Sequence, residues 1–183
     1  MTAKAHTISI VYMAMFIALI TVCSWISIPV GIPFTLQTFA MFVTIGLIGT
    51  KRGTISIALY VLLGAVGVPV FSGFKGGFST LLGPTGGYII GFVIGGFVTG
   101  IIIDLFGKKK DVILLACAML AGLLVCYAFG TAWFMVVYAQ NGSAIGLTSA
   151  LALCVVPFII PDCLKIALAI FLTRTLCRYT QLS

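Results

Sequence analysis

Charged side chains are scarce in this sequence, and acidic ones are the scarcest. Only 7% of the 183 residues are charged, three residues are acidic, none of them is glutamate, and His6 is the single histidine. Soluble domains carry about 25% charged residues. Because hydrophobic residues make up 62% of the chain, the composition excludes an ordinary soluble domain. It predicts an all-α integral membrane protein.

The same scarcity argues against catalysis and against a metal centre. The aspartates do not cluster, the histidine is near the N-terminus, and the six cysteines form no CxxC pair. Hydrolysis needs a nucleophile with a base, and a metal site needs clustered ligands. We therefore expect no enzyme activity, no catalytic residue and no metal site. Cysteines within apolar segments, such as Cys126 and Cys154, are expected to be packing residues.

Six apolar segments approach the length of about 20 residues that a spanning helix needs. They are approximately residues 8–28, 35–50, 53–69, 84–106, 111–139 and 147–177. Residues 1–183 are therefore predicted to form one membrane domain of six transmembrane helices. The last segment contains Pro157 and Pro161, and proline suits the first turn of a helix better than its interior. We expect a short helix or re-entrant piece over 145–156 and a final span that begins near one of these prolines.

The net charge of +7 does not predict nucleic-acid binding, because the basic residues lie in short clusters at the ends of apolar runs. One side of the membrane receives Lys4, residues 50–53, residues 107–111, Arg174 and Arg178, whereas Lys75 is the cation of the connecting loops on the other side. The positive-inside rule then places both termini in the cytoplasm.

Glycines recur every four residues at Gly83, Gly87, Gly91 and Gly95. Residues four apart share a helix face. A face of small residues lets a second membrane helix approach closely, so we expect this span to pack tightly against a neighbour.

Asp162 and Lys165 lie well inside the last apolar segment, three positions apart. On a helix this spacing places them on one face, and charges within a bilayer are energetically unfavourable unless they are paired or functional. Two readings stay open: a structural ion pair at a helix start, or a binding site with a carboxylate acceptor and an ammonium donor.

Residues 71–88, FSGFKGGFSTLLGPTGGY, form a long glycine-rich loop with one cation, Lys75. The loop is not a phosphate-binding P-loop, which requires GxxxxGK followed by serine or threonine. Glycines allow close approach of the backbone to a ligand. We expect the loop to cover a polar site near the outer surface, with Lys75 attracting an anionic group and Tyr88 packing against an apolar ring.

Three stretches resemble the BioY family, the biotin-capturing S components of energy-coupling-factor (ECF) transporters. They are GVPVFSGFKGGFSTLLGPTGGYIIGF at 67–92, PFIIPDCLK at 157–165 and IPFTLQTF at 32–39. The resemblance implies a six-helix S-component bundle with a biotin pocket near the outer face. The predicted substrate-binding residues are Asp162, Lys165, Gly76, Gly77, Thr85, Gly86, Gly87, Tyr88 and Gln37, together with Lys75, which is chosen for its charge. Among these, Asp162 would accept from the ureido N–H groups of biotin, Lys165 would donate to the ureido oxygen or to the carboxylate, and Lys75 with the backbone of Gly76 and Gly77 would receive the carboxylate.

The sequence departs from the family pattern at two of these positions. Pro161 stands where the family usually has glycine before the aspartate, and Lys75 stands where the family commonly has a small polar residue. The role of Lys75 therefore rests on its charge alone.

The resemblance also implies partners: biotin, the lipid bilayer, a transmembrane coupling protein contacted through Ala14 and Ala18, and two cytoplasmic ATPases of the ABC type. It implies a multi-pass protein of a prokaryotic cell membrane, with no cofactor besides the ligand biotin. Packing of Ala14 and Ala18 within the bundle is the alternative for those residues. An S component for thiamine or riboflavin, or a small membrane transporter unrelated to biotin, are the alternatives for the function.

Overall fold

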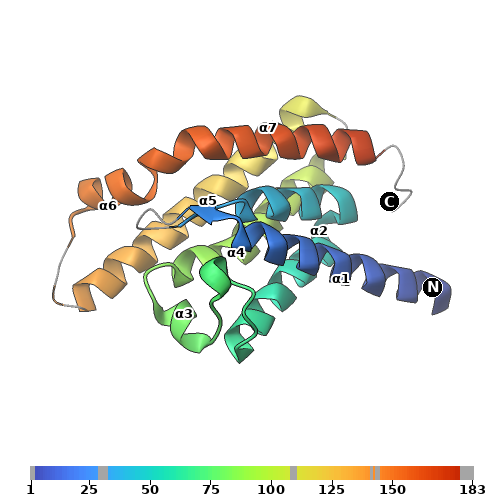
Figure 1. The fold of residues 1–183 in the computed structure, drawn as a ribbon. Coiled ribbons are helices and arrows are strands. Elements are labelled where there is room, and N and C mark those ends of the chain that lie inside the picture. Colours follow the sequence, from blue (N-terminus) through green and yellow to red (C-terminus); the bar gives the residue numbers. More distant parts are fainter. Residues whose placement is uncertain (1–2, 29–32, 108–110, 141, 143–144, 178–183) are drawn as a thin grey trace.

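The computed structural model of the chain describes residues 3–28, 33–107, 111–140, 142 and 145–177. Within these residues the chain is a bundle of helices, α1 Ala3–Trp25, α2 Gln37–Val66, α3 Phe78–Leu82, α4 Gly86–Phe106, α5 Val112–Gln140, α6 Leu147–Cys154 and α7 Ile159–Leu176 (Figure 1). Two short 3-10 turns, η1 Ser72–Phe74 and η2 Val156–Phe158, interrupt the connections. The all-α membrane fold predicted from composition is confirmed.

Five stretches of the described chain are long and apolar enough to cross a membrane, rather than the six predicted: His6–Trp25, Gln37–Val66, Gly86–Phe106, Val112–Gln140 and Leu147–Leu176. The difference lies in α2, which includes both of the segments predicted over 35–50 and 53–69. The predicted count of six separate helices therefore differs by one from the five found here, because two predicted spans are the two halves of a single element. Large apolar side chains remain exposed on the outside of the bundle, among them Leu105, Ile113 and Phe171, which is the surface that a lipid environment requires.

The α2 element is not straight. Gly49 has non-helical backbone angles, φ 82° and ψ 173°, a region that only glycine adopts without strain. Beyond Gly49 the chain folds back on itself. The close approach of the two halves shows this, since an ideal Cβ on Gly53 would lie 3.1 Å from the Cα of Ile45. At the far ends of the two halves, Gln37 Nε2 donates to Tyr60 Oη over 2.7 Å. The two halves of α2 are therefore packed against each other in opposite directions.

The last segment divides as predicted. Helix α6 ends at Cys154, η2 contains Pro157, and α7 begins at Ile159 with Pro161 in its first turn. Proline has no N–H group, and the N–H groups of a first turn have no partner within the helix. The break divides this stretch into two helices, and the first turn of α7 carries the buried Asp162.

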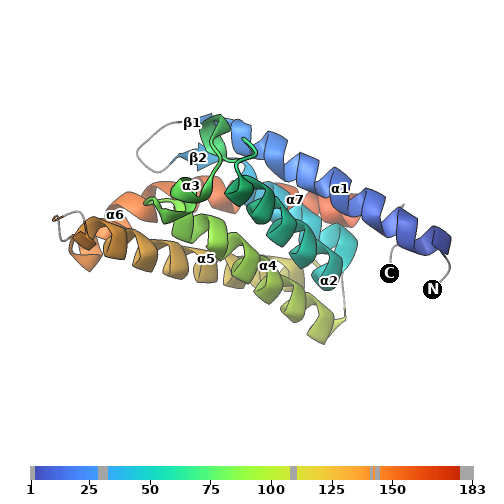
Figure 2. The same ribbon diagram turned by 90° about the horizontal axis from the view of Figure 1, so that it is seen from below.

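Helices α4 and α5 lie side by side along the bundle (Figure 2). An ideal Cβ on Gly95 would lie 2.5 Å from the backbone oxygen of Gly122, and one on Gly91 would lie 3.3 Å from the Cα of Cys126. The glycine spacing thus serves close packing within the chain, as expected. Gly83 lies outside this face, because α4 begins at Gly86.

The segments at the end of the bundle away from the termini are short, and they include two strands and two short helical turns. Strands β1 Ser27–Ile28 and β2 Phe34–Thr35 pair antiparallel between α1 and α2, and η1 and α3 lie in the glycine-rich loop. Helix α1 begins and α7 ends at the opposite end of the bundle (Figures 1 and 2). This arrangement agrees with the prediction that the termini share one side. Among the basic residues used for that prediction, Lys108 to Lys110 and Arg178 lie outside the described residues.

Candidate functional site

A cavity of about 450 Å³ lies between the helices at the end of the bundle away from the termini. Its lining comes from α2, α4, α5, α6 and α7 and from the glycine-rich loop. Small-molecule sites typically have volumes of about 300–1,000 Å³, with mainly apolar walls and few polar groups. The walls here follow that pattern, with the aromatic and aliphatic side chains of Ile89, Phe92, Phe134, Leu153 and Phe158 between two polar ends.

One polar end is a buried ion pair at the start of α7. Asp162 and Lys165 are 3% and 5% exposed, and Lys165 Nζ lies 2.7 Å from Asp162 Oδ1. The spacing of three residues brings both side chains to one helix face, as the sequence predicted. Lys165 also lies over the ring of Phe34, with Nζ 3.9 Å from the ring centroid. Each charge therefore has a favourable partner, which burial requires.

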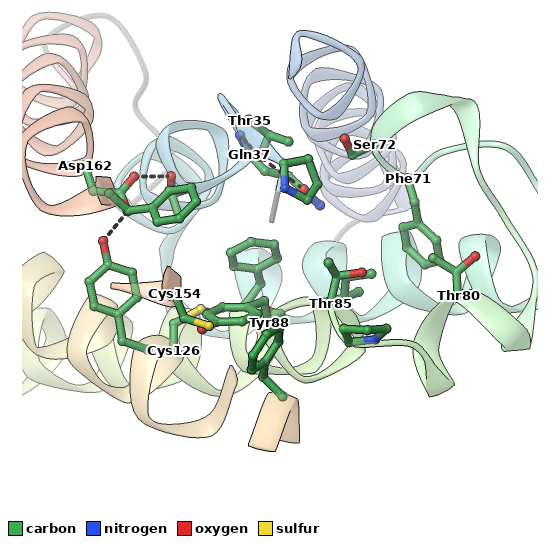
Figure 3. Close-up of a pocket in the computed structure, with 18 of the residues that line it drawn as sticks. Thr35, Gln37, Phe71, Ser72, Thr80, Thr85, Tyr88, Cys126, Cys154 and Asp162 are labelled. Carbon is green, nitrogen blue, oxygen red and sulfur yellow. Dashed lines mark hydrogen bonds between the residues drawn. The ribbon is translucent and has the colours of Figure 1, made fainter. Parts of the chain in front are cut away.

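Two hydroxyl groups complete the surroundings of the carboxylate. Thr38 Oγ1 of α2 donates to Asp162 Oδ1 over 3.1 Å, and Tyr127 Oη of α5 donates to Oδ2 (Figure 3). Three helices thus meet at one carboxylate. Sequence reasoning missed Thr38 and Tyr127, because neither residue is distinguished by spacing or charge and both lie far from Asp162 in the chain.

The middle of the cavity carries two of the predicted residues. Tyr88 lines it, and its hydroxyl lies 3.0 Å from Thr131 Oγ1. Gln37 also lines it, 5% exposed, with its amide nitrogen bonded to Tyr60 as described above. Cys126 and Cys154 are free, buried, and also line this part of the wall (Figure 3).

The other polar end belongs to the glycine-rich loop, where Lys75, Ser72, Thr80 and Thr85 line the cavity. Lys75 is exposed. The loop is closed on itself at this point, because the Phe71 N–H donates to the Lys75 carbonyl over 2.9 Å. Trp133 Nε1 of α5 donates to the Gly83 carbonyl over 3.1 Å.

Four of the predicted glycines do not line the cavity. The Gly77 N–H donates to the Gly64 carbonyl over 2.7 Å, and a Cβ on Gly76 would lie 2.5 Å from the Val68 carbonyl oxygen. Gly86 packs against the backbone of Leu81, and Gly87 packs against Trp133. These glycines shape the loop and its packing on α5. The chain itself fills the space beside Gly76, Gly86 and Gly87, and contact of the four glycines with a ligand stays a prediction.

The predicted partner residues lie elsewhere. Ala14 and Ala18 are exposed on α1, so they are not packed inside the bundle. Across the described part of the chain, no group of three His, Cys, Asp or Glu side chains is arranged to hold a metal ion.

The fold and the cavity together define a multi-pass membrane protein with a ligand-sized cavity between its helices and a paired charge at one end of that cavity. Comparison with known proteins makes the class specific. Residues 1–181 match the BioY family, and the chain belongs to this family.

The relatives are similar over nearly their whole length. The biotin transporter BioY of Thermotoga maritima is 43% identical over 155 residues, which are 84% of this chain and 86% of that protein. The probable biotin transporter BioY of Pyrococcus horikoshii is 41% identical over 94% of this chain and 97% of that protein. A crystal structure of the S component for biotin from an ECF-type ABC transporter has a TM-score of 0.86 at 29% identity, covering 98% of this chain and 95% of that one.

Proposed function

We propose that this chain is the biotin-binding S component of an ECF-type importer and that it captures biotin in the cavity described above. The observation that carries this proposal is the buried Asp162–Lys165 pair at one end of an otherwise largely apolar cavity. Membership of a family whose relatives are named biotin transporters supports the choice of ligand.

The chemistry of biotin matches both the apolar walls and the polar ends of the cavity. Its bicyclic ring is mostly apolar and suits the aromatic walls, while its ureido group offers two N–H donors and one carbonyl acceptor. In this proposal the Asp162 carboxylate accepts one ureido N–H. The Lys165 ammonium has three N–H donors, of which one serves Asp162, so it can also donate to the ureido oxygen.

The carboxylate of biotin is assigned to the loop end of the cavity. Lys75 is a cation that lines this end, and an exposed ammonium attracts an anion without the cost of full desolvation. Ser72 is a second donor that lines the same end. The backbone N–H of Gly77 already donates to the Gly64 carbonyl, so it is not free to bind the biotin carboxylate. We therefore assign the carboxylate to the side chains of Lys75 and Ser72.

The import step is assigned to partner proteins. We infer a transmembrane coupling protein and two cytoplasmic ATPases, with this chain binding biotin and hydrolysing nothing. Exposure of Ala14 and Ala18 on α1 supports this face as the contact with the coupling protein, because small exposed residues let a second membrane helix approach closely.

Equilibrium binding of biotin to the detergent-purified chain tests the proposal. We expect binding by the wild type and loss of more than about tenfold in affinity in Asp162→Asn and Lys165→Ala, because each removes a charged hydrogen-bond partner. Asp104→Asn is the matched control, since Asp104 is exposed at the other end of the bundle and its replacement should leave affinity unchanged. A folded wild type that does not bind biotin, but binds thiamine or riboflavin, would overturn the choice of ligand and leave the fold standing.

A further inference from the structure

The Asp162 carboxylate has little hydrogen-bonding capacity left for a ligand. A carboxylate accepts about four hydrogen bonds, and three are already made by Lys165, Thr38 and Tyr127. If biotin binds as proposed above, its ureido group brings two N–H donors that point away from each other. One of them can reach Asp162, and the other needs a second acceptor on a different wall of the cavity.

Gln37 lies on such a wall. It begins α2, it lines the cavity, and its neighbour Thr38 contacts Asp162. Its side-chain amide can present either an oxygen acceptor or a nitrogen donor, depending on how the group is turned. Whether the oxygen or the nitrogen of the Gln37 amide faces the ligand therefore depends on the hydrogen bond that the opposite end of the amide makes with the protein.

Tyr60 sets the orientation of the Gln37 amide. Its hydroxyl donates its one proton to the Val70 carbonyl over 2.9 Å, and a carbonyl can only accept. The Tyr60 oxygen is then left to accept, and Gln37 Nε2 donates to it over 2.7 Å. Tyr60 is fully buried, so water does not compete for this arrangement. Because Nε2 is turned toward Tyr60, Gln37 Oε1 lies on the other side of the amide, where it accepts from Thr35 Oγ1 over 3.4 Å. An amide oxygen has two lone pairs, so Oε1 can accept one further hydrogen bond from a ligand in the cavity.

We infer that Tyr60 is a positioning residue for ligand specificity: it fixes the Gln37 amide so that its oxygen faces the cavity as the acceptor for the second ureido N–H. Tyr60 itself does not line the cavity. It acts through Gln37, and through Val70 it also ties this orientation to the segment that leads into the glycine-rich loop. This inference rests on the proposed function.

A double-mutant cycle on the full chain tests the inference. We expect Tyr60→Phe and Gln37→Ala each to weaken biotin binding by about tenfold, the effect of one buried hydrogen bond. If Tyr60 acts through Gln37, the double variant should bind within about twofold of Gln37→Ala, because the second change removes nothing further. A double variant about a hundredfold weaker than wild type would overturn the inference.

Ser24→Ala is the matched control. Ser24 is buried, and its one hydroxyl proton is shared between the Val70 carbonyl and the Thr21 carbonyl. Its oxygen also contacts Tyr60, but Ser24 has no hydrogen bond to Gln37 among the described residues, so Ser24→Ala alters the hold on Val70 and leaves the Gln37–Tyr60 hydrogen bond in place. Its removal should leave biotin affinity within about twofold of wild type. A loss as large as that of Tyr60→Phe would mean that holding the loop, rather than orienting the amide, is what matters, and would overturn the inference.

A second measurement does not depend on the folding of Tyr60→Phe. Biotin methylated at one ureido nitrogen lacks one N–H donor, so the wild type should bind it at least about tenfold more weakly than biotin. That ratio should fall toward one in Gln37→Ala for the nitrogen that faces Gln37. Unchanged ratios in Gln37→Ala for both methylated isomers would overturn the inference while leaving biotin binding intact, whereas absence of biotin binding by the wild type would overturn both proposals.

Discussion

The two lysines that line the cavity have the same side chain and opposite surroundings. Lys165 is buried, ion-paired to Asp162 at 2.7 Å and placed over the Phe34 ring. Lys75 is exposed, and within the described residues its ammonium makes no ion pair. The comparison shows that a positive charge contributes in two ways here. The buried ammonium is part of the structure of the bundle, whereas the exposed one is proposed to act on a ligand mainly through its electric field.

This difference sets the size of the effect that each replacement should have. Removing one partner of a buried ion pair leaves the other charge without compensation, which is strongly destabilising. Removing an exposed charge changes an interaction that water and salt already weaken. The following variants test the contrast from its strongest to its weakest consequence.

The largest effect is expected from Asp162→Ala, which leaves the Lys165 ammonium buried without its carboxylate. We expect the free energy of unfolding in detergent to fall by about 3–5 kcal/mol, measured by chemical denaturation. The double variant Asp162→Leu with Lys165→Met removes both charges and should recover most of the stability, but not biotin binding. If the single variant were as stable as the wild type, the pair would not be the structural element that its burial implies.

A smaller effect is expected from Tyr127→Phe, which keeps the ring and removes the hydroxyl that donates to Asp162 Oδ2. Because this hydrogen bond is made to a charged group, we expect a loss of about 1.5–3 kcal/mol in unfolding free energy. Tyr138→Phe is the control: Tyr138 lies on the same helix, lines the same cavity and packs on Phe134, and no hydrogen bond of its hydroxyl is found in the described part of the structure. Equal losses in the two variants would contradict the role of Tyr127.

The smallest effect is expected from Lys75→Ala. We expect unchanged stability and a loss of less than about fivefold in biotin affinity, mainly through slower association and strongest at low salt. Association rates measured at two ionic strengths check this, with Lys51→Ala at the other end of the bundle as the control of equal charge change. A large loss that does not depend on salt would show that Lys75 makes a direct, desolvated contact and would narrow the contrast with Lys165.

Local features of the fold were predictable because their causes are local. The apolar runs predicted the helical membrane protein, and the prolines predicted the break before α7. The glycine spacing predicted that this span packs closely against a neighbour, which the structure shows to be α5. The predicted spans over 35–50 and 53–69 correspond to the two halves of α2, but the position of the fold-back at Gly49 was not predicted, because a single glycine among apolar residues does not reveal its backbone angles.

The candidate site was predictable only in part. Asp162, Lys165, Lys75, Thr85, Tyr88 and Gln37 line the cavity, whereas Gly76, Gly77, Gly86 and Gly87 do not. A motif indicates that a glycine is needed, but it does not distinguish close approach to a ligand from close approach to the chain itself. The GPTGGY run resembles a binding motif, yet the space beside Gly86 is occupied by Leu81 and the space beside Gly87 is occupied by Trp133.

The sequence by itself determined that this chain lies in a membrane and that Asp162 and Lys165 share a face, since hydropathy and helical spacing depend on neighbours along the chain. Only the tertiary structure decided that Thr38 of α2 and Tyr127 of α5 donate to that aspartate, and that Tyr60 holds Gln37. These contacts join residues that are 124, 35 and 23 positions apart. Their formation depends on how whole helices pack, which no local pattern specifies.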